Sequence, residues 1–405
     1  MGLRLSLYLG LLVGTLLVRL LWELRFAPAW VYLVLAFLAL GVGLWTIRGG
    51  SAWVWLGGAV TLVGLVGGYF APLVSLLALA GLFLSYRGWQ SQLSERDQAA
   101  FWGWALVWPA VALLLLWQVL PAFYAVWLSL LDRFNFLGPS QFAGLSNYQI
   151  LLRDPLFWKA MGNTFWFVAF TVPIGIGLAT LIAVLLNERI RFQGLLRTLY
   201  FLPYITALTA AAAVWDWIYN PEFGFLNYLL GTQGLDWLNR PEGVFASLLK
   251  PLGLQLQGFM AGPSLAFVAI MIMTIWHFLG YQIVVLLAGL QNIPKEYYEA
   301  AELDGASWWQ QQRLITWPLL SPTTFFLFTL GLIGAFQVFT QVLILTPTGG
   351  VLQDTLTITL YLYNKGFRDS DFSYASAIAV VVFAVILVLT LVQQRVLERR
   401  VNYEA

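Results

Sequence analysis

A polar stretch at residues 292–318, between two long apolar segments, holds the residues best suited to a directed contact with a partner. Glu299 supplies one negative charge in this stretch. Ala300, Ala301 and Gly305 follow it, and such small residues let another molecule approach the backbone closely. We therefore interpret the stretch as a docking surface, on which the small residues allow close packing and Glu299 can form an ion pair with the partner.

Capping residues in the same stretch predict two short helices joined at a glycine. Asn292 can cap the first helix, and Pro294 fits its first turn, where the missing proline N–H costs nothing. Gly305 ends this helix, because glycine most readily takes the left-handed conformation after a helix. Ser307 and Gln310 form a capping box that starts the second helix. Residues 292–318 are thus expected to fold as a helix–glycine–helix elbow.

Ionisable side chains within apolar segments are the groups that bind the coupling ion in a gradient-driven transporter. The central apolar segments offer two, Asp216 near the end of one segment and His277 in the middle of another. A carboxylate near water and a neutral imidazole bonded to a neighbouring helix explain both without ion coupling. The chain has no G-x-x-x-x-G-K-[ST] phosphate loop, so we expect nucleotide hydrolysis on another polypeptide.

The composition of the 405-residue chain indicates a membrane protein. Hydrophobic residues make up 60% of it and charged residues 10%, whereas soluble domains carry about a quarter charged residues. The net charge of +2 is too small to indicate nucleic-acid binding, so membrane lipid is the expected surrounding. Because the chain has no cysteine, no thiol chemistry or cysteine metal site is expected. We expect no catalytic residue, metal or cofactor in this chain.

The apolar segments predict an all-α polytopic membrane protein with two parts. Residues 1–86 are expected to hold about four accessory transmembrane helices, at 3–22, at 29–47 and in a hairpin within 52–86, since about 20 apolar residues cross a bilayer. A polar stretch then marks the start of a six-span core at 87–405. The six core spans are expected at 102–125, 164–187, 198–219, 263–290, 319–345 and 373–393.

Positive charges predict the orientation of these spans, because cytoplasmic loops carry an excess of Lys and Arg. Arginines cluster on the side that also carries the elbow: Arg189, Arg191, Arg197, Arg395, Arg399 and Arg400. Both chain termini are then cytoplasmic. The expected outer loops are 126–163, 220–262 and 346–372, and the apolar runs of 220–262 predict an interfacial element on the outer surface.

The elbow carries a set of residues with a known spacing: Glu299, Ala300, Ala301, Gly305, Ile315 and Pro318. This set resembles the EAA loop of ABC importer permeases, a family that usually has leucine where this chain has Trp317. The resemblance implies that the elbow is a cytoplasmic loop that couples the chain to an ATPase. Pro318 is expected to end the second helix and to begin the next span.

The resemblance covers about 87–405 and is greatest to carbohydrate-type permeases, in particular the larger permease subunit of the maltose type. It is carried by 276–281, 286–294, 346–350 and 374–378, with Tyr361 and Phe367. Two features depart from that subunit. Its large outer domain has no counterpart, since the matching loop is only 126–163, and the first 86 residues hold more spans than its N-terminal hairpin.

The resemblance also implies an assembly and a location. This chain would be the permease subunit of a sugar importer in the cytoplasmic (inner) membrane. It would form the translocation path with a second permease subunit. Two cytoplasmic ATPase subunits would bind the ATP, and an extracytoplasmic solute-binding protein would deliver the sugar.

A sugar path needs aromatic faces for the C–H surfaces of the sugar and amides or hydroxyls for its hydroxyl groups. The fourth and fifth core spans offer both kinds of side chain: Trp276, Phe278, Tyr281 and Gln282, then Phe336, Gln337, Phe339 and Gln341. Gln337 and Gln341 are the sharpest candidates, because they lie one turn apart in a predicted span and buried amides need partners.

Two other classes of function stay open. A membrane-embedded enzyme acting on a lipid-linked sugar would need charged residues clustered where the spans meet the interface. Asp132 with Arg133, and Asp369 with Asp371, are available, but no spaced motif joins them. The only residues that support a gradient-driven carrier are Asp216 and His277. Vesicle uptake with and without ATP, in the presence of ionophores, separates these classes from an ATP-driven importer.

Overall fold

The computed structural model describes residues 107, 114–134, 140–188, 193–232 and 234–397. The predicted accessory spans within 1–86 and the boundary at residue 87 lie outside these ranges and stay predictions. Within the described ranges the secondary structure is helical, and the only β-type pairs are two isolated bridges. The predicted all-α polytopic fold is therefore confirmed, while the number of N-terminal helices stays a prediction. The architecture below is that of the unit from Val119 onward.

Four described helical segments are long and apolar enough to cross a membrane. They are α8 (Pro155–Asn187), α13 (Leu265–Gln291), α17 with α18 (Ser321–Phe336 and Thr340–Leu345) and α20 (Phe372–Leu397). A bent pair, α9 (Gln193–Ile205) and α10 (Leu208–Ile218), makes a fifth if both halves count as one span. The first predicted core span, 102–125, lies largely outside the described residues; its described end is a π-helix (Leu115–Val119) that continues into α6 (Leu120–Ser129).

The second core span begins nine residues before its predicted start at residue 164. Asp154 caps α8 by accepting a hydrogen bond from the Leu156 N–H at 2.9 Å, and Pro155 occupies the first turn. The prediction came from the apolar stretch alone, and a helix can extend past the hydrocarbon layer. The predicted outer loop 126–163 therefore contains α7 (Ser146–Arg153) and the first turns of α8.

The third core span, predicted as one helix at 198–219, is broken. Its two halves meet at an angle of 98°. Pro203 removes a backbone donor from the end of α9, and Ala207 leaves the helical region with φ −56° and ψ 129°. The bend could not be predicted from the long apolar stretch, because the hydropathy of a segment indicates whether it lies in an apolar environment and not whether its helix is straight.

The fifth core span, predicted as one helix at 319–345, is interrupted after Phe336. Phe339, with φ −142° and ψ −61°, precedes the start of α18. Carbonyl groups freed by the interruption accept from threonine hydroxyls: Thr359 donates to Phe336 O and Thr357 to Val338 O, both at 3.3 Å. A break at membrane depth is stable only where such partners are present.

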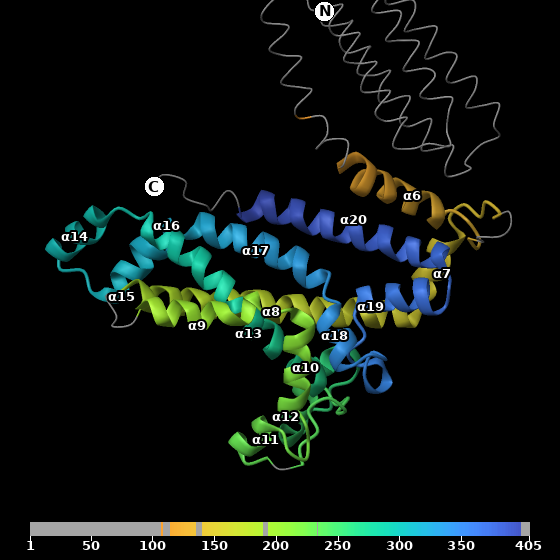
Figure 1. The fold of residues 1–405 in the computed structure, drawn as a ribbon, viewed down its shortest axis with the longest axis horizontal. Helices are drawn as coiled ribbons and strands as arrows, with labels where there is room; N and C mark the ends of the chain where they lie inside the picture. Colours follow the sequence, from red (N-terminus) through yellow and green to blue (C-terminus); the bar gives the residue numbers. More distant parts are fainter. Residues whose placement is uncertain (1–106, 108–113, 135–139, 189–192, 233, 398–405) are drawn as a thin grey trace, which may run out of the picture. The chain divides into compact units, whose positions relative to one another are not determined.

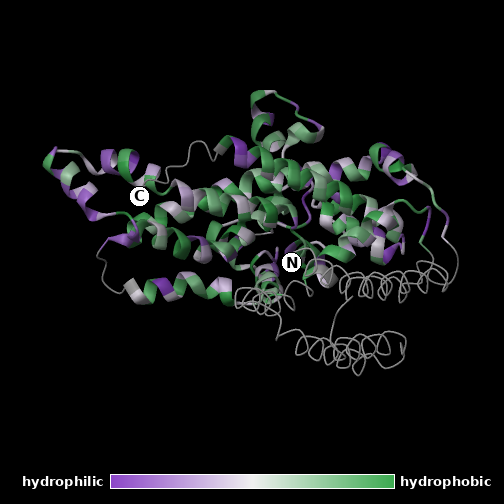
Figure 2. Ribbon diagram, turned by 90° about the horizontal axis from the view of Figure 1, so that it is seen from above, coloured by the Kyte–Doolittle hydropathy of each residue, from purple (hydrophilic) through white to green (hydrophobic). Residues whose placement is uncertain are grey.

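The helix α13 lies at the centre of the bundle and packs against α8 and α9. Phe267, Ile270 and Met273 in its first half and Leu286 in its second are fully buried. Gly280 permits the closest approach, because a Cβ atom at that position would lie 2.0 Å from the carbonyl oxygen of Tyr200 on α9. The hydropathy colouring shows the long helices as mainly hydrophobic (Figure 2).

Both remaining predicted outer loops contain helices. The 220–262 segment includes α11 (Phe225–Leu230), α12 (Val244–Leu249) and two short 3-10 turns, and these extend away from the long helices (Figure 1). The 346–372 segment includes a 3-10 turn (Val351–Gln353), α19 (Ile358–Tyr363) and a π-helix (Asn364–Arg368). The elbow helices lie at the opposite end of the bundle from α7 and α19 (Figure 1).

Candidate coupling elbow and translocation path

The first elbow helix, α14 (Lys295–Leu303), ends as the sequence predicts. Gly305 has φ +74°, and its N–H donates to Glu302 O at 3.0 Å. The Ala306 N–H donates to Ala301 O at 2.9 Å. These two bonds form a Schellman motif, which closes the helix end and sets the direction in which the chain leaves it.

The predicted N-cap of α14 is wrong. Asn292 has helical dihedral angles and is the C-cap of α13, while Pro294 precedes the first residue of α14 and no side chain caps it. The apolar helix α13 extends further than the capping signal suggested, because its last turn packs in the core. Ile293, 5% exposed, joins the same core, so the link from α13 to α14 is short and anchored.

The predicted capping box is present at the second elbow helix, α15 (Trp308–Gln311). The Ser307 N–H donates to Gln310 Oε1 at 2.7 Å. The helix then continues through a π-helix (Gln312–Thr316) into α16 (Trp317–Leu319), so Pro318 does not end it as predicted. A proline ring clashes with the carbonyl four residues earlier in an α-helix, and the wider π-turn before Pro318 accommodates it.

The two halves of the elbow are joined by a side-chain hydrogen bond. Tyr298 Oη on α14 lies 2.9 Å from Thr316 Oγ1 in the π-helix. Tyr298 and Ile315 also pack on the core cluster that contains Leu286 of α13 and Leu320. These contacts tie α14 to the segment that leads directly into α17.

The outward face of the elbow combines charged and exposed apolar side chains. Glu299 and Ala300 are exposed, and Ala301, Ile315 and Pro318 are half-buried. Leu303 is 90% exposed, an unusual value for a large apolar residue. Such a face is suited to binding another protein.

Three of the predicted path residues on α13 lie among aromatic side chains of α9 and α10. Tyr281 stacks on Tyr204 with ring centroids 5.1 Å apart, and Phe278 lies 6.1 Å from the same ring. Trp276 meets Trp215 of α10 edge-on at 5.4 Å. Tyr204 was absent from the predicted set. Its position next to Pro203, where the span bends, is the signal that could have indicated it.

Gln282 lies between helices and not in this aromatic group. Its Oε1 is buried without a hydrogen-bond partner among the described residues. A Cβ atom at Gly175 of α8 would lie 3.2 Å from that oxygen. Gln282 therefore belongs to the packed α8–α13 interface.

The structure separates the candidates of the fifth span. Phe336 is 2% exposed in the core, and the ring of Phe339 packs against Tyr363 of α19 at 5.1 Å. Gln337 is exposed, whereas Gln341 is buried and donates to Thr274 Oγ1 on α13 at 3.2 Å. The two glutamines are not one turn apart in a continuous helix, because the interruption after Phe336 lies between them. Thr274 was not among the predicted residues.

The two ionisable residues that the sequence places within the predicted spans are in different surroundings. His277 is 4% exposed, its ring lies beside Tyr204 and Phe278, and its Nδ1 has no partner within the described ranges. Asp216 is exposed on α10. The described part of the chain contains no group of three His, Cys, Asp or Glu residues that could hold a metal ion.

Comparison with known families agrees with this architecture. Residues 99–403 match the family described as the binding-protein-dependent transport system inner membrane component. The match spans more than half of the chain, so the protein belongs to this family of multi-pass membrane permeases. Its resemblance to the carbohydrate-uptake permeases of ABC importers is thereby confirmed.

Individual relatives match over most of their own length. The lactose transport system permease protein LacF of Rhizobium radiobacter is 34% identical over 294 residues, which is 72% of this chain and 92% of LacF. The trehalose/maltose transport system permease protein MalF of Thermococcus litoralis is 31% identical over 308 residues, covering 76% of this chain and 96% of MalF.

A solved structure has the same fold. The bacterial alginate ABC transporter, crystallised in complex with an alginate pentasaccharide-bound periplasmic protein, includes a chain that matches with a TM-score of 0.61. That match covers 77% of this chain and 98% of the other at 22% identity.

Proposed function

We propose that this chain is the permease subunit of an ATP-driven, binding-protein-dependent importer for a sugar. In this proposal it forms the translocation path with a second permease subunit. Two ATPase subunits bind ATP on the cytoplasmic side, and a solute-binding protein delivers the sugar from outside. The single observation that carries the proposal is the elbow, a rigid and exposed pair of helices continuous with a membrane span.

The path residues favour a sugar as substrate. Tyr204, Phe278 and Tyr281 present aromatic rings to one another across α9 and α13, and aromatic faces bind the C–H surfaces of sugars. Relatives named for lactose and for trehalose and maltose share the family, and the matching solved structure transports alginate. A disaccharide or oligosaccharide is the substrate class that these features support together.

The elbow supplies the link between ATP hydrolysis and the path. ATPase subunits would bind its exposed face, with Glu299 directed at a basic residue or at a helix N-terminus. A push on α14 passes through the Tyr298–Thr316 hydrogen bond and the shared core contacts into α17. In this arrangement the elbow, both chain termini and the ATPase subunits lie on the cytoplasmic side.

Two substitutions test this assignment. A β-branched residue at φ +74° costs about 1–2 kcal/mol and misdirects the chain after α14, so Gly305→Val should impair ATPase docking and transport. Glu299→Lys should do so by reversing the contact charge. ATPase pull-down and ATP-dependent sugar uptake are the measurements.

The matched control is Gly231→Val. Gly231 has φ +67° at the end of α11, and a Cβ atom there, as at Gly305, meets no described atom within 4 Å. The same local strain away from the elbow should leave docking and uptake intact. Normal docking and full transport in both elbow variants would show that the elbow is not the coupling element.

A further inference from the structure

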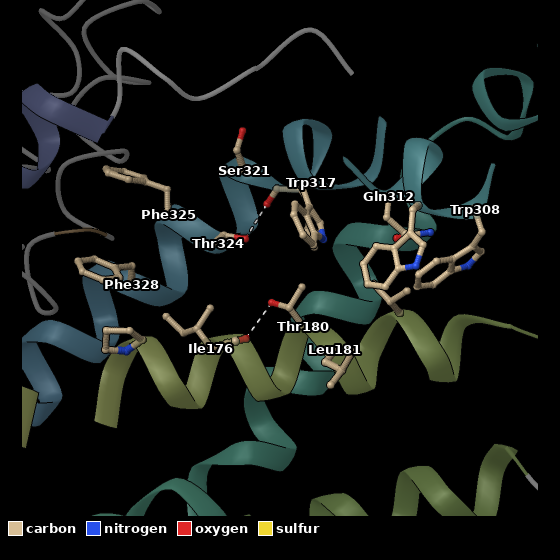
Figure 3. Close-up of a pocket in the computed structure, with 15 residues that line it drawn as sticks. Ile176, Thr180, Leu181, Trp308, Gln312, Trp317, Ser321, Thr324, Phe325 and Phe328 are labelled. Carbon is tan, nitrogen blue, oxygen red and sulfur yellow. Dashed lines mark hydrogen bonds between the residues drawn. The ribbon is translucent and has the colours of Figure 1, made fainter. Parts of the chain in front are cut away.

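A groove of about 800 Å³ runs between α8, the elbow and α17. We call it the elbow groove. Figure 3 shows its walls, with α8 on one side and the start of α17 on the other. Residues that define it include Gly177, Thr180, Trp308, Gln312, Thr324 and Phe328.

The walls of the elbow groove present an apolar surface even where they carry hydroxyl groups. Thr180, Ser321 and Thr324 each donate a hydrogen bond to a carbonyl three or four residues earlier, at 2.8, 2.6 and 3.1 Å. Their donors are thus used within the helices, and the wall between them is formed by aliphatic and aromatic side chains. The groove therefore suits a hydrocarbon occupant.

One polar atom at the elbow end of the groove lacks a partner. Gln312 is 7% exposed, lines the groove, and its Oε1 accepts no hydrogen bond from the described residues. A buried acceptor left unpaired costs about 1–3 kcal/mol. An occupant with an N–H or O–H group at this end would remove that cost.

Three tryptophans mark the same end. Trp308, Trp309 and Trp317 all line the groove, and the first two pack edge-on at 4.9 Å. Indole rings gather at the level of lipid head groups, where one edge is apolar and the N–H meets polar groups. The groove therefore runs from head-group level into the hydrocarbon layer along α8 and α17.

We propose that the elbow groove binds one membrane glycerophospholipid. Its acyl chain lies along the apolar walls, and its head group donates a hydrogen bond to Gln312 Oε1. The donor is the ammonium of an ethanolamine head or a hydroxyl of a glycerol head. The proposal concerns binding to this chain alone and holds whichever side of the membrane the elbow occupies.

The size of the groove favours a lipid over a helix of a partner subunit. Pockets of roughly 300–1,000 Å³ with apolar walls and a few oriented polar groups are typical of small-molecule sites. A helix about 10 Å across would fill 800 Å³ in about two turns. A membrane-spanning partner helix needs roughly 20 residues, which is over five turns.

The first test fills the groove from α8. Gly177 lines the groove and a Cβ atom there meets no described atom within 4 Å, so Gly177→Phe adds a side chain on the groove side of α8 without a clash at its Cβ. Gly194→Phe is the control, because Gly194 is an exposed α9 glycine with the same open surroundings outside the groove. Native mass spectrometry of the full-length chain, titrated with palmitoyl-oleoyl phosphatidylglycerol, measures retained lipid.

Wild type and Gly194→Phe should each retain one tightly held lipid, and Gly177→Phe should bind it at least about tenfold more weakly. Equal retention by all three proteins would overturn the proposal. A second result would also overturn it: Gly177→Phe retains lipid as the wild type does but no longer co-purifies with a second permease. In that case a protein helix, and not a lipid, occupies the groove.

The second test addresses the head group. Gln312→Met keeps the side-chain length and removes the acceptor. Wild type should prefer phosphatidylglycerol and phosphatidylethanolamine about fivefold over phosphatidylcholine with the same acyl chains, the effect of one net hydrogen bond. Gln312→Met should bind all three alike. An absence of preference in the wild type, or a preference that survives in Gln312→Met, would overturn the role of Gln312.

Discussion

Two glutamines of the fifth span, Gln341 and Gln337, have different surroundings and therefore different expected roles. Gln341 is buried and donates to Thr274 Oγ1, which bridges α18 and α13 across the interruption of the fifth span. Gln337, four residues earlier, is exposed. One glutamine is therefore a structural link, and the other is free to meet a substrate or a partner.

We expect Gln341→Ala to lower the free energy of unfolding by about 0.5–1.5 kcal/mol, because it removes the buried hydrogen bond to Thr274, whose hydroxyl keeps its bond to Ile270 O. Gln337→Ala should leave stability unchanged and weaken sugar uptake if that side chain lines the path. Thermal unfolding in detergent and uptake kinetics measure the two effects. Equal stability of the two variants would contradict the structural role of Gln341.

At the scale of elements, one carboxylate joins three helices at the end of the bundle opposite the elbow. Asp154 caps α8 and accepts hydrogen bonds from the Tyr361 hydroxyl of α19 and, at 2.7 Å, from the Tyr374 hydroxyl of α20. Burial raises the pKa of Asp154, but the hydrogen bonds from both tyrosines and from backbone N–H groups outweigh it and lower the pKa below its ordinary value of 3.8.

A lowered pKa in the folded state means that the junction stabilises the fold above pH 4 and loses this contribution as the pH falls through the folded pKa. Tyr374→Phe should therefore cost about 1.5 kcal/mol at neutral pH, and the difference from wild type should shrink below about pH 4. Unfolding of both proteins across this pH range is the measurement.

The control for this junction is Tyr228→Phe, which removes a hydroxyl from a side chain that is 80% exposed. Its stability should match wild type at every pH. A cost for Tyr374→Phe that does not fall as the pH is lowered through the folded pKa of Asp154 would mean that the ionised carboxylate is not what the hydroxyl stabilises.

At the scale of the whole molecule, the question is where the energy for transport enters. His277 lies buried among aromatic rings and Asp216 is exposed, so the described spans hold no chain of ionisable groups. His277→Gln and Asp216→Asn should therefore leave ATP-driven uptake largely intact and insensitive to ionophores. Loss of uptake in a folded variant that still docks the ATPase would favour a gradient-driven carrier.

The amino-acid sequence by itself determined the class of protein, the fourth and sixth core spans, and two features of the elbow, its central glycine and its capping box. Hydropathy depends on composition over about 20 residues, and helix caps depend on neighbours within one turn, so both can be read without tertiary contacts. The left-handed Gly305 and the Ser307–Gln310 capping box were predicted for this reason. The Asn292 cap failed because the core-packed end of α13 makes Asn292 the C-cap of that helix.

Only the tertiary structure decided where the spans break and which side chains meet. The interruption after Phe336 depends on carbonyl partners from a distant segment, Thr357 and Thr359, and the 98° bend after Ile205 was not visible in the hydropathy pattern. The same breaks separate Gln337 from Gln341. Contacts such as Tyr204 with Tyr281 and Gln341 with Thr274 join residues far apart in the chain, and no local pattern encodes those distances.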